Sequence, residues 1–142
     1  MPLTIELVPY SNWAFNLRSI LTEEQWGIVR RAKYKEANYR CEICGNQTSK
    51  YFNDIKHPVE CHEIWKYDDI NKIQSLDGLI ALCHDCHRAK HIGKANADGV
   101  SEVIYEHIAN VNDWDIDSVE KYISECFDVW EERSKYNWTL KI

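Results

Sequence analysis

The chain has 142 residues, of which 44% are hydrophobic and 28% charged, and this composition indicates one soluble globular domain rather than a disordered chain. No apolar run approaches the roughly 18 residues that a membrane span requires, which excludes an integral membrane protein. The net charge is −6, but residues 95–142 hold 11 acidic against 4 basic side chains. A surface for nucleic acid would therefore have to be local, in the first two thirds of the chain, with the acidic C-terminal region facing away.

The first residues, Met1 to Leu7, lack the basic region and the long apolar region of a secretory signal. We therefore expect a cytoplasmic protein. A reducing compartment keeps cysteine thiols free to bind metal.

Residues 1–21 show no clear period, and we expect them to be irregular. Thr22 and Gln25 then match a capping box, in which two side chains satisfy the exposed backbone N–H groups at a helix start. This pattern predicts a helix from Glu23 to Ala37 that stops at Asn38. Its other face is either an ordinary solvated surface or a patch that contacts phosphates, and it carries Arg30, Arg31, Lys33 and Lys35.

Two Cys-x-x-Cys pairs, Cys41/Cys44 and Cys83/Cys86, are separated by 38 residues. Each pair can hold one side of a tetrahedral zinc ion through two thiolates on a tight turn, and Gly45 follows Cys44 where such a turn often needs a positive φ. Disulfides or a redox-active pair are the alternatives. Two separated pairs in a reducing compartment favour one structural zinc site with four cysteine ligands.

Between the cysteine pairs, the pattern predicts a β-hairpin. Its strands run from His57 to Trp65 and from Leu79 to Leu82, and a polar loop from Lys66 to Gly78 joins them. A short helix from Asp85 to Ile92 follows, with Gly93 as its stop.

Two further helices are predicted near the C-terminus, from Ser101 to Asn110 and from Asp117 to Lys135. The second has an apolar stripe at helical spacing that includes Cys126, which we interpret as a core residue and not as a ligand. Residues 136–142 can add a terminal strand.

Three histidines can form a second site. His87 and His91 are four residues apart, so a helix places both rings on one face, and His62 on the first hairpin strand can reach that face. Three convergent imidazoles make a metal site. A histidine beside a cysteine ligand can instead be a hydrogen-bond partner of the zinc site, and this alternative applies most to His84 and His57.

Residues 39–94 resemble a known family through three motifs: Cys-x-x-Cys-Gly, Glu-Cys-His-Glu-Ile, and Leu-Cys-x-x-Cys-His-x-x-x-His. Together they resemble the HNH endonuclease motif, a ββα-metal finger of the treble-clef type, and the flanks are similar to small bacterial and phage proteins labelled HNH endonucleases. The resemblance implies an α+β fold. We expect a single domain over residues 1–142: an N-terminal segment and helix (1–38), the zinc finger (39–94) and a C-terminal helical extension (95–142).

The resemblance also implies a nuclease, in which a divalent ion binds the scissile phosphate and a neutral histidine takes a proton from the attacking water. His87 stands at the asparagine position of the motif and His91 at its final histidine. This sequence departs from the motif in the hairpin: either His62 is the ligand and Glu63 stands where the base should be, or His62 is the base and Cys61 is the ligand. We favour the first register, which makes His62, Glu63 and His87 the expected catalytic residues.

The second metal, held by His62, His87 and His91, is expected to be Mg²⁺, Mn²⁺, Ni²⁺ or Zn²⁺, and imidazole ligands suit the last three ions better than Mg²⁺. If Glu63 completes the coordination, the site is structural, whereas a water in that place leaves it open for catalysis. The expected phosphate contacts are Arg88, Lys90 and Lys94.

The sequence thus predicts a metal-dependent endonuclease that acts on DNA. One alternative is a catalytically inactive zinc-finger module that binds DNA or a protein. Another is a phage or mobile-element accessory protein whose acidic C-terminal helix binds a protein partner or mimics nucleic acid.

Overall fold

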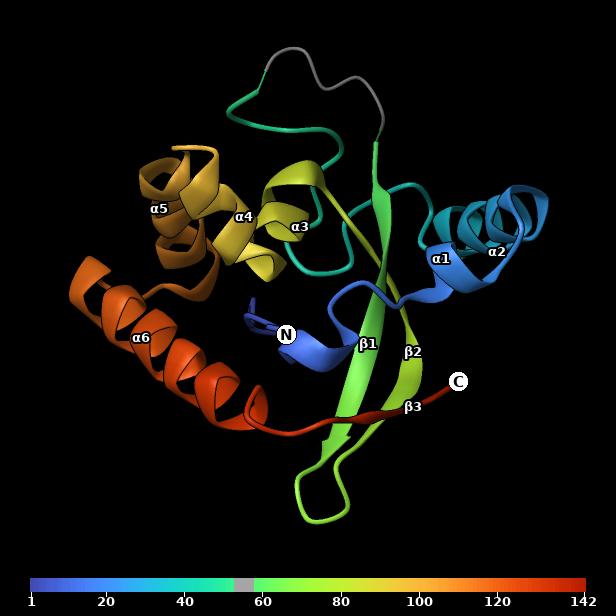
Figure 1. Ribbon diagram of the computed structural model, residues 1–142. Coiled ribbons are helices and arrows are strands. Elements are labelled where there is room, and N and C mark those ends of the chain that lie inside the picture. The colour runs from blue at the N-terminus through green and yellow to red at the C-terminus, as the bar shows by residue number, and fades with distance from the viewer. Residues whose placement is uncertain (53–57) are drawn as a thin grey trace.

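A long antiparallel hairpin runs through the middle of the molecule in the computed structural model, which describes residues 1–52 and 58–142 (Figure 1). Its strands are β1 (Glu60–Asp68) and β2 (Ile73–Leu82), with a bulge between Ile64 and Trp65. A short third strand, β3 (Thr139–Lys141), pairs in parallel with the beginning of β2. The architecture is therefore α+β, with a small three-stranded sheet of order β1-β2-β3.

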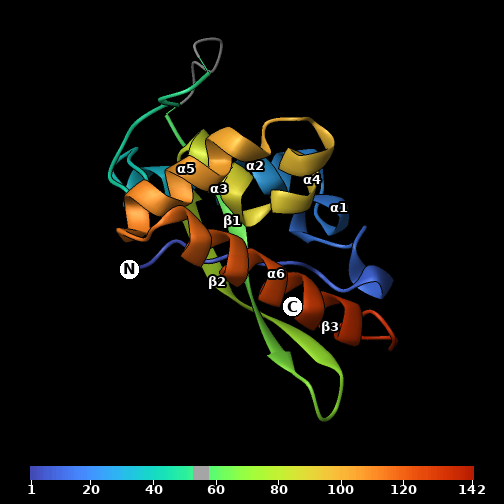
Figure 2. The same ribbon diagram turned by 90° about the vertical axis from the view of Figure 1, so that its left-hand side faces the viewer.

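In residues 1–52 and 58–142, six α-helices surround this sheet, after a 3-10 turn at Tyr10–Asn12. On one side of the hairpin lie α1 (Leu17–Ile20) and α2 (Glu23–Glu36), as Figure 1 shows. On the other side are α3 (His84–Lys90), α4 (Ile92–Ala97), α5 (Ser101–Asn112) and α6 (Ile116–Arg133). In Figure 2, α5 and α6 face the viewer and the hairpin and α2 lie behind them. In the described part of the chain, none of the helices has the length and apolar character needed to cross a membrane.

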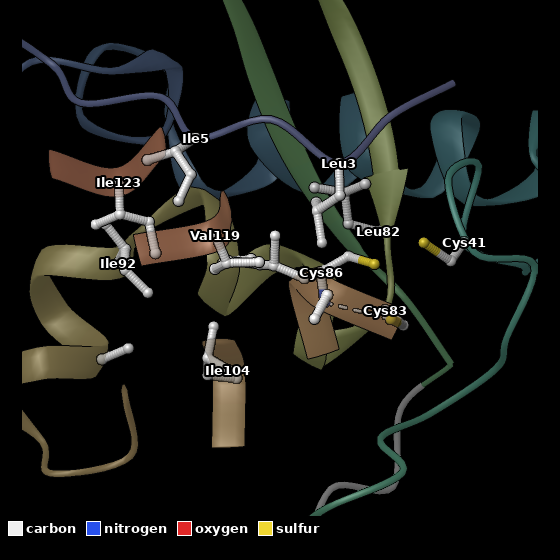
Figure 3. Close-up of a cluster of buried hydrophobic side chains, with 14 of the residues drawn as sticks. Leu3, Ile5, Cys41, Leu82, Cys83, Cys86, Ile92, Ile104, Val119 and Ile123 are labelled. Atoms are coloured by element: carbon white, nitrogen blue, oxygen red, sulfur yellow. Dashed lines mark hydrogen bonds between the residues drawn. The ribbon is translucent and has the colours of Figure 1, made fainter. Parts of the chain in front are cut away.

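The hydrophobic core lies between the end of β2, the helices α3 to α6, and the N-terminal segment. Leu3 and Ile5 are buried in it beside Val119 and Ile123 of α6 (Figure 3). Side chains of α5 and α6 fix the backbone of this N-terminal segment: the Leu3 N–H donates to Asn112 Oδ1 (2.7 Å) and the Ile5 N–H to the Tyr122 hydroxyl (3.0 Å). The segment is thereby held beside α3, where the histidines lie.

The capping box at the start of α2 is confirmed. The Gln25 N–H donates to Thr22 Oγ1 (3.1 Å), and the Thr22 N–H donates to Gln25 Oε1 (2.9 Å). The helix ends at Glu36, and Asn38 adopts a positive φ of 55°, which confirms it as the stop.

The hairpin differs from the prediction in its turn. The polar stretch from Lys66 to Gly78 is mostly strand, because Asp68 accepts the backbone N–H groups of Ile70 and Asn71 (3.0 Å each) and closes a tight turn after β1. The polar side chains belong to strand residues and not to a loop. The predicted start of the first strand, His57, lies outside the described residues.

The helix after the second cysteine pair also differs from the prediction. The helix α3 ends at Lys90, the backbone bends at His91 (φ −108°, ψ 53°), and α4 begins at Ile92. Gly93 therefore lies inside a helix and does not end one. The two C-terminal helices and the terminal strand lie where they were predicted, with ends shifted by at most three residues.

Candidate functional site

Four cysteine sulfurs gather where the loop after α2 meets the start of α3. The Sγ atoms of Cys41, Cys44, Cys83 and Cys86 all lie within 4.8 Å of one another, and those of Cys44 and Cys83 are 3.5 Å apart. Zn–S bonds of about 2.3 Å at tetrahedral angles would separate two sulfurs by roughly 3.8 Å. The cluster can therefore hold one zinc ion. All six cysteines of the chain are free, so neither pair forms a disulfide.

Backbone N–H groups point at two of these sulfurs. The Cys44 N–H donates to Cys41 Sγ and the Cys86 N–H donates to Cys83 Sγ, each at 3.4 Å. The first turn is closed by Gly45, whose φ of 79° favours glycine. Hydrogen bonds from the neighbouring thiols lower the pKa of Cys41, which promotes the thiolate form that binds zinc.

A histidine from α5 completes the surroundings of the cysteine cluster. His107 is buried, and its Nε2 lies 3.2 Å from Cys86 Sγ. His107 is not among the site residues predicted from the sequence. The sequence does contain a signal for this contact. His107 lies between Ile104 and Ile108 on the buried side of a helix, where an imidazole needs a polar partner.

The three predicted histidines do converge. His62 lies on β1, His87 in the last turn of α3, and His91 directly after that helix; ligand nitrogens of all three lie within 4.8 Å of one another. The Nε2 atoms of His87 and His91 are 3.2 Å apart. Two Zn–N bonds of about 2.0–2.1 Å at a tetrahedral angle would separate the nitrogens by roughly 3.3 Å. The donor set therefore fits a single metal ion.

The ring of His91 favours its neutral form. His91 is exposed, and its ring packs edge-on against those of His87 and His62, at centroid distances of 4.8 Å and 5.2 Å. Loss of hydration, together with the charges of His87 and His62, lowers the pKa of His91 to about 3. A neutral imidazole is the form that binds metal.

Two carboxylates that the sequence analysis missed orient the histidines. Glu60 lies two residues before His62 on the same face of β1, and its Oε2 is 2.5 Å from His87 Nδ1, which leaves Nε2 of that ring to face His91. Its other oxygen is 3.4 Å from His84 Nδ1. His84 was expected to be either a metal ligand or a hydrogen-bond partner of the zinc site. In the structure it is a hydrogen-bond partner of Glu60 and not of a thiolate.

The second carboxylate, Glu6, comes from the N-terminal segment. Its Oε2 lies 3.2 Å from His62 Nε2, while its Oε1 is 3.4 Å from the Nζ of Lys90. Burial works against ionisation of Glu6, but the hydrogen bond with His62 and the charge of Lys90 hold its pKa below the ordinary value.

The structure corrects two of the predicted site residues. Glu63 does not lie with the histidines: adjacent strand residues point to opposite faces, and Glu63 Oε1 instead accepts the backbone N–H of Leu17 (3.2 Å). Lys90 is not a surface residue. It is buried under the N-terminal segment, where its Nζ donates to Thr4 Oγ1 (2.7 Å), so it has no path to a backbone phosphate.

Replacing Glu60 with glutamine tests its electrostatic role. Burial raises the pKa of Glu60, but the hydrogen bonds and charges of His87 and His84 outweigh this effect and lower it to about 2. Because the folded pKa lies below the unfolded value, Glu60 stabilises the fold above about pH 5, and this contribution is lost as the pH falls toward 2. We expect Glu60→Gln to lower the free energy of unfolding by about 1–3 kcal/mol at pH 7 and by less at pH 4. Urea denaturation at both pH values measures the loss of stability, and Glu120→Gln, at an exposed position of α6, is the control. An equal loss at pH 7 and pH 4 would contradict the electrostatic role of Glu60.

A groove of about 690 Å³ runs beside the histidines, between α2 and the α3–α4 segment, with the start of β1 between them. His87 and His91 line it, so a bound ligand can reach the three-histidine cluster. Its basic side chains come from both walls and comprise Arg18, Arg30, Arg88 and Lys94. Two of these share one carboxylate: Arg88 Nη2 lies 2.7 Å and Lys94 Nζ 3.6 Å from Asp98 Oδ2.

The basic side chains predicted on one face of α2 differ in their contacts. Arg30 lines the groove, whereas Lys33 forms ion pairs with Glu42 (3.2 Å) and Glu36 (3.6 Å). The guanidinium of Arg31 lies over Gly27.

Part of the chain is similar to a characterised nuclease. Over 68 residues, 48% of the chain, it is 34% identical to the type IV methyl-directed restriction enzyme EcoKMcrA of Escherichia coli (strain K12). The match covers 24% of that enzyme, so the chain corresponds to about a quarter of its relative's length. No family model matches the chain. Among solved structures, a significant match is likewise absent.

Proposed function

We propose that the chain is a metal-dependent endonuclease of HNH type that hydrolyses phosphodiester bonds in DNA. The observation that carries the proposal is the convergence of His62, His87 and His91 at the edge of a basic groove. The partial similarity to a methyl-directed restriction enzyme supports DNA as the substrate. The four-cysteine cluster at the start of α3 supports a fold built around structural zinc.

In this proposal the histidines hold the second metal, which is Zn²⁺, Ni²⁺, Mn²⁺ or Mg²⁺, with preference for the first three because all three protein ligands are imidazoles. When bound, the ion supplies Lewis-acid stabilisation of the phosphate and of the leaving oxygen. Glu60 fixes the tautomer of His87, and Glu6 fixes the orientation of His62. We do not assign the proton-transfer step to Glu63, because its carboxylate is engaged by Leu17.

The phosphate contacts in this proposal are Arg88 and Lys94, which line the groove beside His87 and His91. Asp98 already neutralises part of their charge. DNA must displace this carboxylate, and because phosphate contacts release counterions, binding should weaken as the salt concentration rises.

The same geometry supports a second candidate function, a zinc module that binds DNA without cutting it. The specific observation in its favour is Glu63, which stands at the motif's base position and faces away from the histidines. A protein partner for the acidic helix α6 stays a prediction from the sequence.

Nicking of supercoiled plasmid tests the proposed function. Zinc-loaded protein is incubated with plasmid and with Mg²⁺, Mn²⁺, Ni²⁺ or Zn²⁺ in turn, and open-circle product is quantified on a gel. We expect product with at least one ion and none without added ion. If folded, zinc-loaded protein makes no product with any ion but retards DNA, the binding module replaces the nuclease.

A further inference from the structure

The groove wall formed by α2 carries an aromatic, an arginine and a second aromatic side chain in a row. Trp26, Arg30 and Tyr34 are spaced four residues apart, which places them on one face of the helix, and all three line the groove. Each is half-buried. The two rings therefore offer accessible surface toward the groove.

These aromatic residues are not explained by packing of the hydrophobic core. That core lies on the far side of the hairpin, around α3 to α6, and among the described residues Trp26 and Tyr34 are neither members of it nor packed against it. Aromatic side chains outside a core that face a groove are typical of ligand sites, where they bind planar groups.

The charges of the same wall point to an anionic ligand. Arg18 and Arg30 line the groove, and in the part of the chain that the structure describes neither has a carboxylate within ion-pair distance. Arg88, Lys94 and Arg133 all have such a partner. Glu23 of α2 also lines the groove but forms no ion pair with either arginine among the described residues, so both guanidinium groups can bind an anionic ligand.

The opposite wall carries the three-histidine cluster. His87 and His91 face the groove from α3 and its C-terminal end, across from the α2 residues. A ligand that spans the groove contacts both walls. The volume of the groove, about 690 Å³, falls within the range of small-ligand sites.

We infer that the Trp26–Arg30–Tyr34 face binds DNA that has unpaired bases, with bases stacked on the two aromatic rings and phosphates held by Arg18 and Arg30. The inference rests on the proposed function for its assignment of DNA as the substrate. Aromatic side chains stack on bases that are free of their partners, whereas a regular duplex keeps its bases stacked inside. The preferred substrate is thus single-stranded DNA, or duplex DNA with an unpaired segment, whose backbone the α2 wall presents to the histidines.

Fluorescence anisotropy with labelled oligonucleotides tests the inference on the full, zinc-loaded chain without added divalent ion. The probes are a single strand, its perfect duplex, the same duplex with a central unpaired segment, and an RNA strand of the same sequence. We expect the single strand and the interrupted duplex to bind at least 10-fold more tightly than the perfect duplex. RNA binding as tight as that of the DNA strand would overturn the assignment to DNA.

Single substitutions test whether the Trp26–Arg30–Tyr34 face is the binding surface. Each of Trp26→Ala and Tyr34→Ala is expected to weaken single-strand binding about 5- to 100-fold, and Trp26→Phe, which keeps a ring, to weaken it much less. Tyr136→Ala, at an exposed aromatic near β3, and Lys121→Gln, on α6, are the matched controls for an aromatic ring and for a charge. Arg30→Gln should weaken binding more than Lys121→Gln does. Zinc content and thermal unfolding show that each variant is folded.

Two failures are distinguishable. If the alanine variants bind every probe as the wild type does and still nick plasmid, the inference is overturned and the nuclease stands. If the wild type neither binds nor cuts any of these DNA molecules, the proposed function fails as well.

Discussion

Cys41→Ala is expected to release the structural zinc and to unfold residues 39–94. The four cysteines join the loop after α2 to the end of β2 and the start of α3. Hydrogen bonds support the same junction: the Glu42 N–H donates to Ala81 O (2.9 Å), the Ala81 N–H to Glu42 Oε2 (2.7 Å) and the Lys50 N–H to Asp85 Oδ2 (2.8 Å). Cys83 and Cys86 are completely buried at the edge of the core, as Figure 3 shows. Removing one ligand leaves three thiols crowded together without the ion that stabilises their thiolate form.

The expected effect is large. Apparent binding free energies of structural zinc are about 10–16 kcal/mol in isolated zinc-finger peptides, and a domain of this size has a total stability of only about 5–15 kcal/mol. Thermal unfolding and zinc content are the measurements, and a chelator added to the wild type should reproduce the effect. Cys126→Ala is the control, because Cys126 is half-buried on α6 outside the cluster, and it should cost no more than about 1 kcal/mol. A Cys41→Ala protein that melts like the wild type would show that the cysteines do not hold a metal.

The sequence predicted those parts of the fold that depend on neighbouring residues. The capping box placed the start of α2, and the Cys-x-x-Cys spacing identified four cysteines that do cluster. The spacing of His87 and His91 likewise brought two rings together across one helical turn. The capping box and the histidine spacing lie within a few residues of the chain, where backbone geometry fixes the outcome. The meeting of the two cysteine pairs, 38 residues apart, follows instead from the four ligands that zinc needs.

The predictions that were wrong concern contacts between distant segments. Lys90 resembles a surface residue at the end of a basic helix, but the N-terminal segment, more than 80 residues earlier, covers it and supplies Thr4 and Glu6 as partners. Glu60 was overlooked because its partner His87 is 27 residues away. The hairpin loop was also predicted too long, from Lys66 to Gly78, whereas β1 ends at Asp68 and β2 begins at Ile73, because polar residues in a strand that faces solvent look like loop residues.

His91→Ala is expected to reduce cleavage by about 100-fold or more while it leaves the fold intact. Loss of a group that only orients a metal ligand costs about 10- to 100-fold in metal affinity or activity, and loss of one of the three ligands themselves should cost more. His91 is exposed and lies after α3, so its removal leaves no buried cavity. The buried His62 offers a second test as His62→Gln, which keeps a polar side chain next to Glu6.

The control is His84→Ala, at the start of α3. His84 contacts Glu60 but does not belong to the three-histidine cluster, so this variant should lower cleavage less than about 10-fold. Metal content measured with cleavage separates the two candidate functions. A wild type that binds two metals and cuts DNA, beside a His91→Ala protein that keeps one metal and does not cut, supports the nuclease. If wild type and His91→Ala both bind one metal and cut equally well, the histidines are not the catalytic site. If the wild type binds two metals and cuts nothing, the second metal is structural, because an ion without an accessible base nearby holds the histidines together but does not hydrolyse phosphate.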